Sequence, residues 1–126
     1  MSKIFSIIIP VYNEEESIED LVREILQNIP SSNYDYEIIV VDDCSEDKTK
    51  KILDKLLLEN SIIYSTNNKN MGQSFSIREG VKLSKSETII TLDGDGQNNP
   101  ADILKLFRVY SDNDKLKLVG GLRTNR

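Results

Sequence analysis

The chain has 126 residues, of which 38% are hydrophobic and 29% charged, so it is long enough for one domain with a hydrophobic core and is unlike a disordered chain. Its net charge of −5 argues against nucleic acid as a partner. The longest apolar run, Phe5 to Val11, is too short for a membrane span and lacks the flanks of a signal peptide, so we expect a cytoplasmic protein. The single cysteine, Cys44, excludes an internal disulfide, and without any histidine no zinc site is expected.

Hydrophobic periodicity predicts strands and helices in strict alternation. The first strand, Phe5 to Val11, leads into a helix that should end before Pro30, with Asn13 as its N-cap and Glu16 completing a capping box. The next predicted elements are a strand at Glu37 to Val41, a helix capped by Ser45, a strand at Ile62 to Ser65, a helix at Gln73 to Lys85 and a strand at Glu87 to Leu92. A last helix with Asn99 as its N-cap and Pro100 at its first position, and a strand at Lys115 to Gly120, complete the chain. Phe75, Ile77, Val81 and Leu83 make only an irregular apolar stripe on the third of these helices.

This alternation predicts an α/β fold with a mostly parallel sheet, right-handed crossovers and helices on both faces. Ligands of such sheets bind at the carboxyl ends of the strands. Four segments that directly follow strands should therefore line one site: Pro10 to Glu14, Asp42 to Ser45, Asp93 to Gln97, and Gly120 to Arg123.

The most informative of these segments is the acidic loop Asp93-Gly94-Asp95-Gly96-Gln97. Two carboxylates one residue apart, with glycines that let the backbone turn both toward one point, present hard oxygen ligands whose mutual repulsion a divalent cation would relieve. The alternative is that Asp and Gly simply end a strand and form a turn. A calcium-binding EF-hand is excluded, because the positions that would need Gly and Glu hold Asn98 and Leu104.

The ligand at this edge should contain phosphate held through the metal, because the sequence has no glycine-rich dinucleotide fingerprint, no Walker A lysine and no nucleophile elbow. Tyr12 offers an aromatic ring, while Glu14, Asp42 and Asp43 offer acceptors for base and ribose donors. A nucleoside diphosphate fits this set.

Four ordered segments also carry a family resemblance. Ile7 to Glu14 (IIIPVYNE), Ile39 to Thr49 (IVVDDCSEDKT), Asn70 to Gly72 (NMG) and Leu92 to Gln97 (LDGDGQ) resemble the successive motifs of family 2 glycosyltransferases with the GT-A fold. Gln97 and the continuation Asn98 to Pro100 are most similar to the dolichyl- or polyprenyl-phosphate sugar transferase branch. The resemblance implies that residues 1–126 form a Rossmann-like donor-binding domain of an enzyme that transfers a sugar from a UDP- or GDP-sugar to a polyprenyl or dolichyl phosphate by metal-assisted inverting displacement.

The resemblance also implies residue roles. Pro10, Tyr12, Glu14 and Asp42 match residues that contact the base and ribose of the donor, with Asp43 close by, and Gly94 matches a residue that lies against the donor. Asp93, Asp95 and Gln97 match a site for Mg²⁺ or Mn²⁺, Arg123 matches a basic residue that meets the donor phosphate, and Asp95 and Arg123 are the expected catalytic residues. Cys44 stands where the family usually has a smaller residue, which affects no expected catalytic group.

Family members continue with an acceptor-side half and, in many of this branch, membrane-associated helices. We therefore expect these residues to be the donor half of a longer protein that associates peripherally with the cytoplasmic face of the membrane, and to bind a nucleotide sugar without transferring it.

Three other functions were considered. A response-regulator receiver would have to start at Ile38, which leaves too little chain, and this sequence lacks the lysine that a receiver has after its last strand. A nucleotidyltransferase would need a glycine-rich basic loop after the first strand, which is also absent. A catalytically silent nucleotide-binding module is the remaining alternative.

Overall fold

The computed structural model describes residues 4–94, 102 and 118–122. Its elements are β1 (Phe5–Val11), α1 (Ile18–Asn28), β2 (Tyr36–Asp42), α2 (Thr49–Leu58), β3 (Ile63–Thr66), α3 (Gln73–Leu83), β4 (Ile89–Leu92) and β5 (Leu118–Leu122). The predicted alternation of strands and helices is confirmed, and most predicted strand and helix bounds lie within three residues of these. The helix predicted to start at Asn99 lies outside the described residues.

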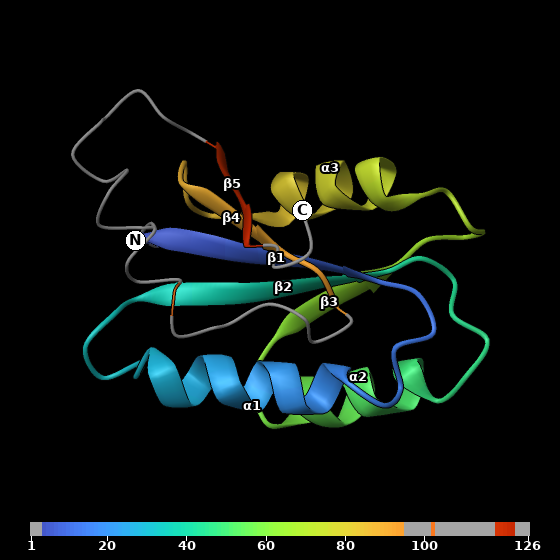
Figure 1. Cartoon of the computed structure of the whole chain (residues 1–126), viewed down its shortest axis with the longest axis horizontal. Coiled ribbons are helices and arrows are strands. Elements are labelled where there is room, and N and C mark those ends of the chain that lie inside the picture. Colours follow the sequence, from blue (N-terminus) through green and yellow to red (C-terminus); the bar gives the residue numbers. More distant parts are fainter. Residues whose placement is uncertain (1–3, 95–101, 103–117, 123–126) are drawn as a thin grey trace.

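The five strands form one sheet in the order β3-β2-β1-β4-β5, and every neighbouring pair is parallel. From β1 the chain builds outward through β2 to β3, then returns to the other side of β1 to add β4 and β5. The strand order thus reverses next to β1, which is where open α/β sheets bind their ligands. Helices α1 and α2 cover one face of the sheet and α3 covers the other (Figure 1). The predicted α/β architecture with helices on both faces is confirmed.

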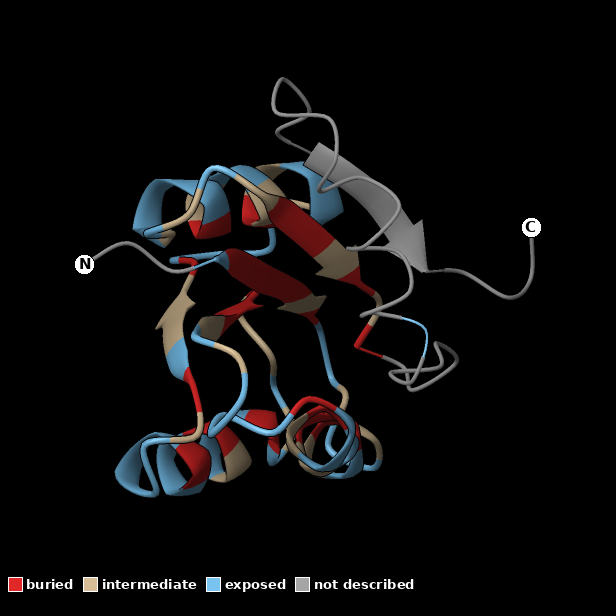
Figure 2. Cartoon of the chain, turned by 90° about the vertical axis from the view of Figure 1, so that its left-hand side faces the viewer, coloured by how far each residue is buried: buried red, intermediate tan, exposed pale blue. Residues whose placement is uncertain are grey.

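The core lies on both sides of β1 and β2, whose side chains alternate between the two faces. Ile7 and Ile9 belong to the larger cluster beneath α1 and α2, while Ile8 belongs to a smaller cluster with Ile39 and Val41. The central strands are accordingly buried on both faces (Figure 2), as a parallel sheet between helices requires. No helix among the described residues has the length and apolar composition needed to cross a bilayer.

The predicted starts of the first two helices are wrong. α1 begins at Ile18, not directly after Asn13, and α2 begins at Thr49, not directly after Ser45. Asn13 adopts a left-handed backbone conformation, with φ 54°, and its Oδ1 accepts a hydrogen bond from the Glu46 amide at 2.8 Å. The Ser45 hydroxyl donates to Asp42 Oδ1 and accepts from the Asn13 amide. Both expected caps therefore use their side chains to join two connections instead of starting a helix.

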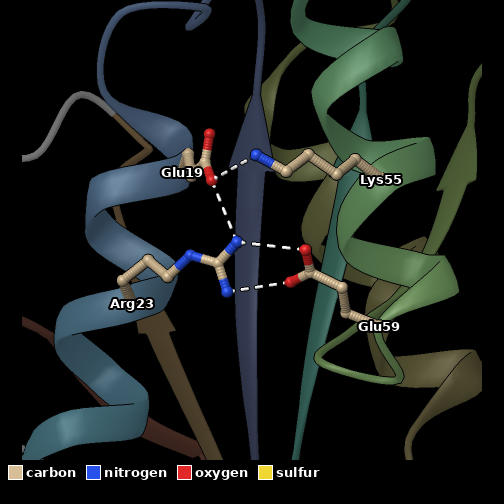
Figure 3. A network of polar contacts seen from close by, with 4 residues as sticks. All are labelled: Glu19, Arg23, Lys55 and Glu59. Atoms are coloured by element: carbon tan, nitrogen blue, oxygen red, sulfur yellow. Dashed lines mark hydrogen bonds and ion pairs between the residues drawn. The ribbon is translucent and has the colours of Figure 1, made fainter.

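A network of four charged side chains joins the exposed faces of α1 and α2 (Figure 3). Arg23 lies 3.0 Å from Glu19 and 2.8 Å from Glu59, and Lys55 lies 2.9 Å from Glu19. Hydrogen bonds from Lys55 and Arg23 lower the pKa of the Glu19 carboxyl. Because all four side chains remain partly exposed to solvent, the network adds little to stability.

Candidate functional site

The connections after β1 and β2 lie at the same end of the sheet, at the right of Figure 1, and are hydrogen-bonded to each other. The Asn13 amide donates to Ser45 Oγ and the Glu14 amide to Thr49 Oγ1, both at 2.8 Å. In the opposite direction, the Glu46 amide donates to the Asn13 side chain at 2.8 Å. Two of the four predicted segments are thus confirmed to meet, and they form one continuous surface at the carboxyl edge.

Three residues predicted to contact the base and ribose lie in the connection after β1 or at the end of that strand. Tyr12 is exposed at the end of β1, with 41% of its surface accessible. Glu14 is half-buried at the following turn. Pro10, in the last part of β1, is also half-buried. Their contact with a nucleotide stays a prediction.

Asp42 ends β2 and is fully buried. Its Oδ1 accepts hydrogen bonds from the amide and the hydroxyl of Ser45, while its Oδ2 is buried without a hydrogen-bond partner. Thr66, its register partner on β3, likewise has a buried hydroxyl without a partner. An unpaired buried polar atom is unfavourable, so a ligand that donated a hydrogen bond here would relieve a penalty already present in the fold.

Asp43 points into the protein and holds the loop at Met71 and Gly72 in place. The sequence did not predict this role. Its Oδ1 accepts from the Met71 amide at 2.7 Å and from Asn67 Nδ2 at 2.8 Å, and its Oδ2 accepts from the Gly72 amide at 2.9 Å. Asn67 Nδ2 also lies 3.0 Å from the buried hydroxyl of Ser76 on α3. Burial disfavours the Asp43 carboxylate, but these hydrogen bonds together outweigh it and lower its pKa. Asp43 therefore anchors the loop before α3 to the end of β2.

The start of the acidic loop lies against the connection after β1. Asp93 follows β4 and is half-buried, and Gln73 Nε2 lies 3.2 Å from its Oδ1. The Gly94 carbonyl accepts a hydrogen bond from the Ser17 hydroxyl at 2.7 Å. Asp95, Gly96, Gln97 and Arg123, the remaining residues of the predicted metal and phosphate site, lie outside the described residues.

The chemistry of this donor set suits a hard divalent cation. Asp93, Asp95 and Gln97 offer only oxygen ligands of the kind that Mg²⁺ and Mn²⁺ prefer. No group of three His, Cys, Asp or Glu side chains able to hold a metal occurs within residues 4–94, 102 and 118–122. Asp93 is the one predicted ligand placed there, and it lies at the expected edge.

Sequence patterns did not predict that Ser17, Thr49 and Asn67 help to hold this edge together. Each is a small polar residue that a helix cap or a loop would explain equally well. What distinguishes them is a hydrogen-bond partner at least 24 residues away in the sequence, and local spacing carries no information about such partners.

The sequence of this chain matches those of known glycosyltransferases. The family model described as glycosyl transferase family 2 matches residues 6–125. The undecaprenyl-phosphate 4-deoxy-4-formamido-L-arabinose transferase of Proteus mirabilis (strain HI4320) is 37% identical over 123 residues, covering 96% of this chain and 37% of the relative. The enzyme of the same name from Photorhabdus laumondii is 39% identical over 126 residues, covering 98% of this chain and 38% of the relative. The chain thus spans less than two fifths of the length of these relatives.

Solved structures share the fold. S. aureus TarS 1-349 in complex with UDP-GlcNAc superimposes with a TM-score of 0.71 and 30% identity, covering 86% of this chain and 31% of that one. A mannosyltransferase from Pyrobaculum calidifontis, in complex with GDP-Man and Mn²⁺, superimposes with a TM-score of 0.64 and 20% identity, covering 75% of this chain and 28% of that one. At 20% identity, the similarity to the Pyrobaculum mannosyltransferase supports a shared fold and nothing further.

Proposed function

This chain belongs to glycosyl transferase family 2, and from that premise we propose that it forms the donor-binding part of an enzyme that transfers a sugar from a nucleotide sugar to a polyprenyl phosphate. Its fold is of the GT-A type. The acceptor class is supported by the two relatives named as undecaprenyl-phosphate sugar transferases, at 37% and 39% identity. The donor class is supported by the likeness to TarS, which was solved with UDP-GlcNAc.

The observation that carries the proposal is the meeting of three strand ends at one edge. The connections after β1 and β2 share hydrogen bonds, and Ser17 joins the first of them to the acidic loop after β4. An aromatic ring, a buried carboxylate and the predicted metal ligand Asp93 are thereby brought to one edge of the sheet. These groups offer a stacking surface, a hydrogen-bond acceptor and a cation ligand, which suit a nucleoside diphosphate.

Tyr12, Pro10 and Glu14 are the proposed contacts for the base and ribose. Asp42 is proposed to accept a hydrogen bond from the base through Oδ2, which has no hydrogen-bond partner within the described residues. Asp43 remains a proposed neighbour of the donor, through the loop that it holds in place.

Asp93, Asp95 and Gln97 would hold Mg²⁺ or Mn²⁺, and Gly94 would lie against the donor. A bound divalent cation supplies positive charge that stabilises the leaving diphosphate as the bond to the sugar breaks. Arg123 is proposed to add a second positive charge at that phosphate, and Asp95 and Arg123 remain the proposed catalytic residues. The nucleotide, UDP or GDP, is the part of the donor that the site leaves open.

A phosphate acceptor also simplifies the chemistry. A phosphomonoester has a second pKa near 6, so the acceptor oxygen is largely anionic at pH 7 and needs little help from a general base. Attack from the face opposite the leaving group inverts the configuration of the sugar. Because polyprenyl phosphates are membrane lipids, the proposal includes peripheral association of the whole protein with the cytoplasmic face of the membrane.

A catalytically silent nucleotide-binding module is the second candidate. The observation that favours it is the coverage of the relatives, since this chain matches 37% of the Proteus protein. Both candidates predict donor binding, and they differ in turnover.

The test is a binding profile measured by calorimetry in the presence of Mn²⁺. UDP-GlcNAc, UDP-glucose and GDP-mannose are compared with ATP, a nucleotide that carries no transferable sugar on its phosphates, and Asp42→Ala is compared with the unmodified chain. We expect one nucleotide-sugar class to bind at least roughly tenfold more tightly than ATP, and Asp42→Ala to remove that preference. Equal binding of all four ligands, or none at all, would contradict the proposal.

A further inference from the structure

Ser17 occupies the N-cap position of α1, immediately before Ile18, yet it does not cap the helix. A serine at this position ordinarily accepts a hydrogen bond from an amide of the first helical turn. Here the side chain makes no capping bond. Its hydroxyl donates instead to the carbonyl oxygen of Gly94 at 2.7 Å, 77 residues further along the chain. Glu14 Oε2 lies farther away, at 3.4 Å, and a hydroxyl has one proton to donate.

The same peptide is held from a second side by close packing. A Cβ atom added to Gly94 would lie 2.6 Å from Val11 Cγ1 and 3.1 Å from the carbonyl oxygen of Pro10. Both distances are shorter than ordinary contacts, so the backbone at Gly94 lies directly against the end of β1. Packing fixes where this backbone lies, and the hydrogen bond from Ser17 fixes the direction of its carbonyl.

This placement connects two functional segments. Gly94 stands between Asp93 and Asp95, and its carbonyl belongs to the peptide bond that leads into Asp95. Ser17 belongs to the connection that carries Tyr12 and Glu14, and the backbone of that connection is tied to Ser45 and Thr49 after β2. The Ser17 hydroxyl is therefore a direct side-chain link between the predicted metal loop and the predicted nucleotide surface.

We propose that Ser17 is a positioning residue for the start of the acidic loop: its hydrogen bond to the Gly94 carbonyl holds Gly94 against the nucleotide-binding connection, so that nucleotide binding assisted by a divalent cation depends on a side chain that touches neither ligand. The inference rests on the proposed function and extends it to a residue that no motif marks. If Ser17 served only to cap the helix, Ser17→Asp would preserve its role, because an aspartate caps a helix well. A carboxylate cannot donate a hydrogen bond to the Gly94 carbonyl, so the same variant should lose the proposed positioning role.

The test compares Ser17→Ala, Ser17→Thr and Ser17→Asp in the full chain, with Ser32→Ala as a control because Ser32 is exposed in the turn after α1. UDP binding is measured by calorimetry with Mn²⁺ and again with EDTA. Mn²⁺ binding is measured separately by the loss of the free-ion electron paramagnetic resonance signal. Thermal melting confirms that each variant is folded.

We expect Ser17→Ala to raise the Kd for UDP in the presence of Mn²⁺ by roughly three- to tenfold, the loss of one hydrogen bond. Ser17→Thr keeps the donor and should stay within about twofold of the unmodified chain. Ser17→Asp should bind at least as weakly as Ser17→Ala, although it restores the cap. In EDTA all variants should bind UDP alike.

Two results would overturn the inference while leaving the proposed function intact. One is equal Mn²⁺-assisted UDP binding by Ser17→Ala and the unmodified chain. The other is an equal loss with Mn²⁺ and with EDTA, which would mean that the nucleotide surface itself had changed. If the unmodified chain bound GDP and not UDP, the same comparison would be made with GDP. If it bound neither UDP nor GDP in the presence of Mn²⁺, the proposed function would be overturned, and this inference with it.

Discussion

Asp43 illustrates how a buried carboxylate can hold a loop at the candidate site. It is 6% exposed, and its two oxygens accept hydrogen bonds from the amides of Met71 and Gly72 and from Asn67 Nδ2. The loop that it holds leads into α3, so the loss of the charge would release one of the segments that line the carboxyl edge.

Asp43→Asn should therefore lower the free energy of unfolding by about 2 kcal/mol, because an amide group brings N–H donors toward other N–H donors and leaves buried groups unpaired. Urea titration at pH 7 measures the change. Asp20→Asn, at an exposed position on α1, is the control and should stay within about 0.5 kcal/mol of the unmodified chain. A loss of the same small size in both variants would refute the anchoring role.

The same carboxylate predicts how stability depends on pH. The pKa of Asp43 is lower in the folded chain than its usual value, so the stabilisation is present above the unfolded pKa of about 3.9 and is lost as pH falls through the folded pKa. The difference in unfolding free energy between the unmodified chain and Asp43→Asn should shrink below about pH 4. Urea titrations at pH 7 and at pH 3 would show this, and a constant difference would mean that the charge contributes nothing.

Asp95 should behave in the opposite way. If turn geometry alone holds Asp93 and Asp95 near each other, Asp95→Asn relieves a like-charge repulsion, and the melting temperature without metal should stay constant or rise. The same variant should lose Mn²⁺-assisted UDP binding. A large fall in melting temperature without metal would assign Asp95 a structural role, and the metal site would have to be sought elsewhere.

At the scale of elements, the packing of α3 explains why the apolar residues of this helix form an irregular stripe. The helix packs on the sheet through the small residues Ser76 and Gly80, which are buried, while Val81 and Leu83 are each 42% exposed. A Cβ atom at Gly80 would lie 2.6 Å from Ile8 Cγ2, so the helix lies unusually close to β1. A search for large apolar residues at helical spacing cannot detect such a face.

Gly80→Ala tests this close packing because two effects oppose each other. Alanine favours the helix by up to about 1 kcal/mol, whereas crowding a well-packed core typically destabilises by about 1–3 kcal/mol. We expect crowding to win and the free energy of unfolding to fall by about 1 kcal/mol. Ser74→Ala, exposed on the same helix, should be neutral or slightly stabilising. If Gly80→Ala stabilised the chain, Ile8 would have room to move and the packing argument would fail.

The strands could be predicted closely from the sequence, because a buried parallel strand is a local apolar run, as at Phe5–Val11. The topology rule for α/β sheets also predicted that the segments after β1, β2 and β4 would meet at one edge. The first turns of α1 and α2 could not be predicted, since Asn13 and Ser45 carry strong capping signals but find partners across the two connections. Local patterns describe what a side chain is able to do, and the tertiary structure decides which of those options it takes.

At the scale of the whole molecule, the chain spans 37% of the Proteus transferase, and the candidate site described above concerns the donor alone. Holding two reactants in a near-attack geometry is worth ~7 kcal/mol or more, so a donor surface without its acceptor surface should bind but scarcely react.

We therefore expect these 126 residues to show negligible sugar transfer to polyprenyl phosphate, while a chain extended to the full length of its relatives transfers at an ordinary rate. Radiolabelled UDP-glucose and GDP-mannose report transfer into the lipid fraction. Robust transfer by the 126 residues alone would show that the acceptor site is already present in them.

The central claim is that this chain binds a nucleoside diphosphate through a divalent cation at the acidic loop. Its most direct test is calorimetric titration of the unmodified chain with UDP and with GDP, in Mn²⁺ and again in EDTA. Since the acidic loop and a diphosphate are both negatively charged, a cation should be required between them. We predict that one of the two nucleotides binds at least roughly tenfold more tightly in Mn²⁺ than in EDTA. Equal affinity in both conditions would remove the metal role from Asp93, Asp95 and Gln97 and contradict the account.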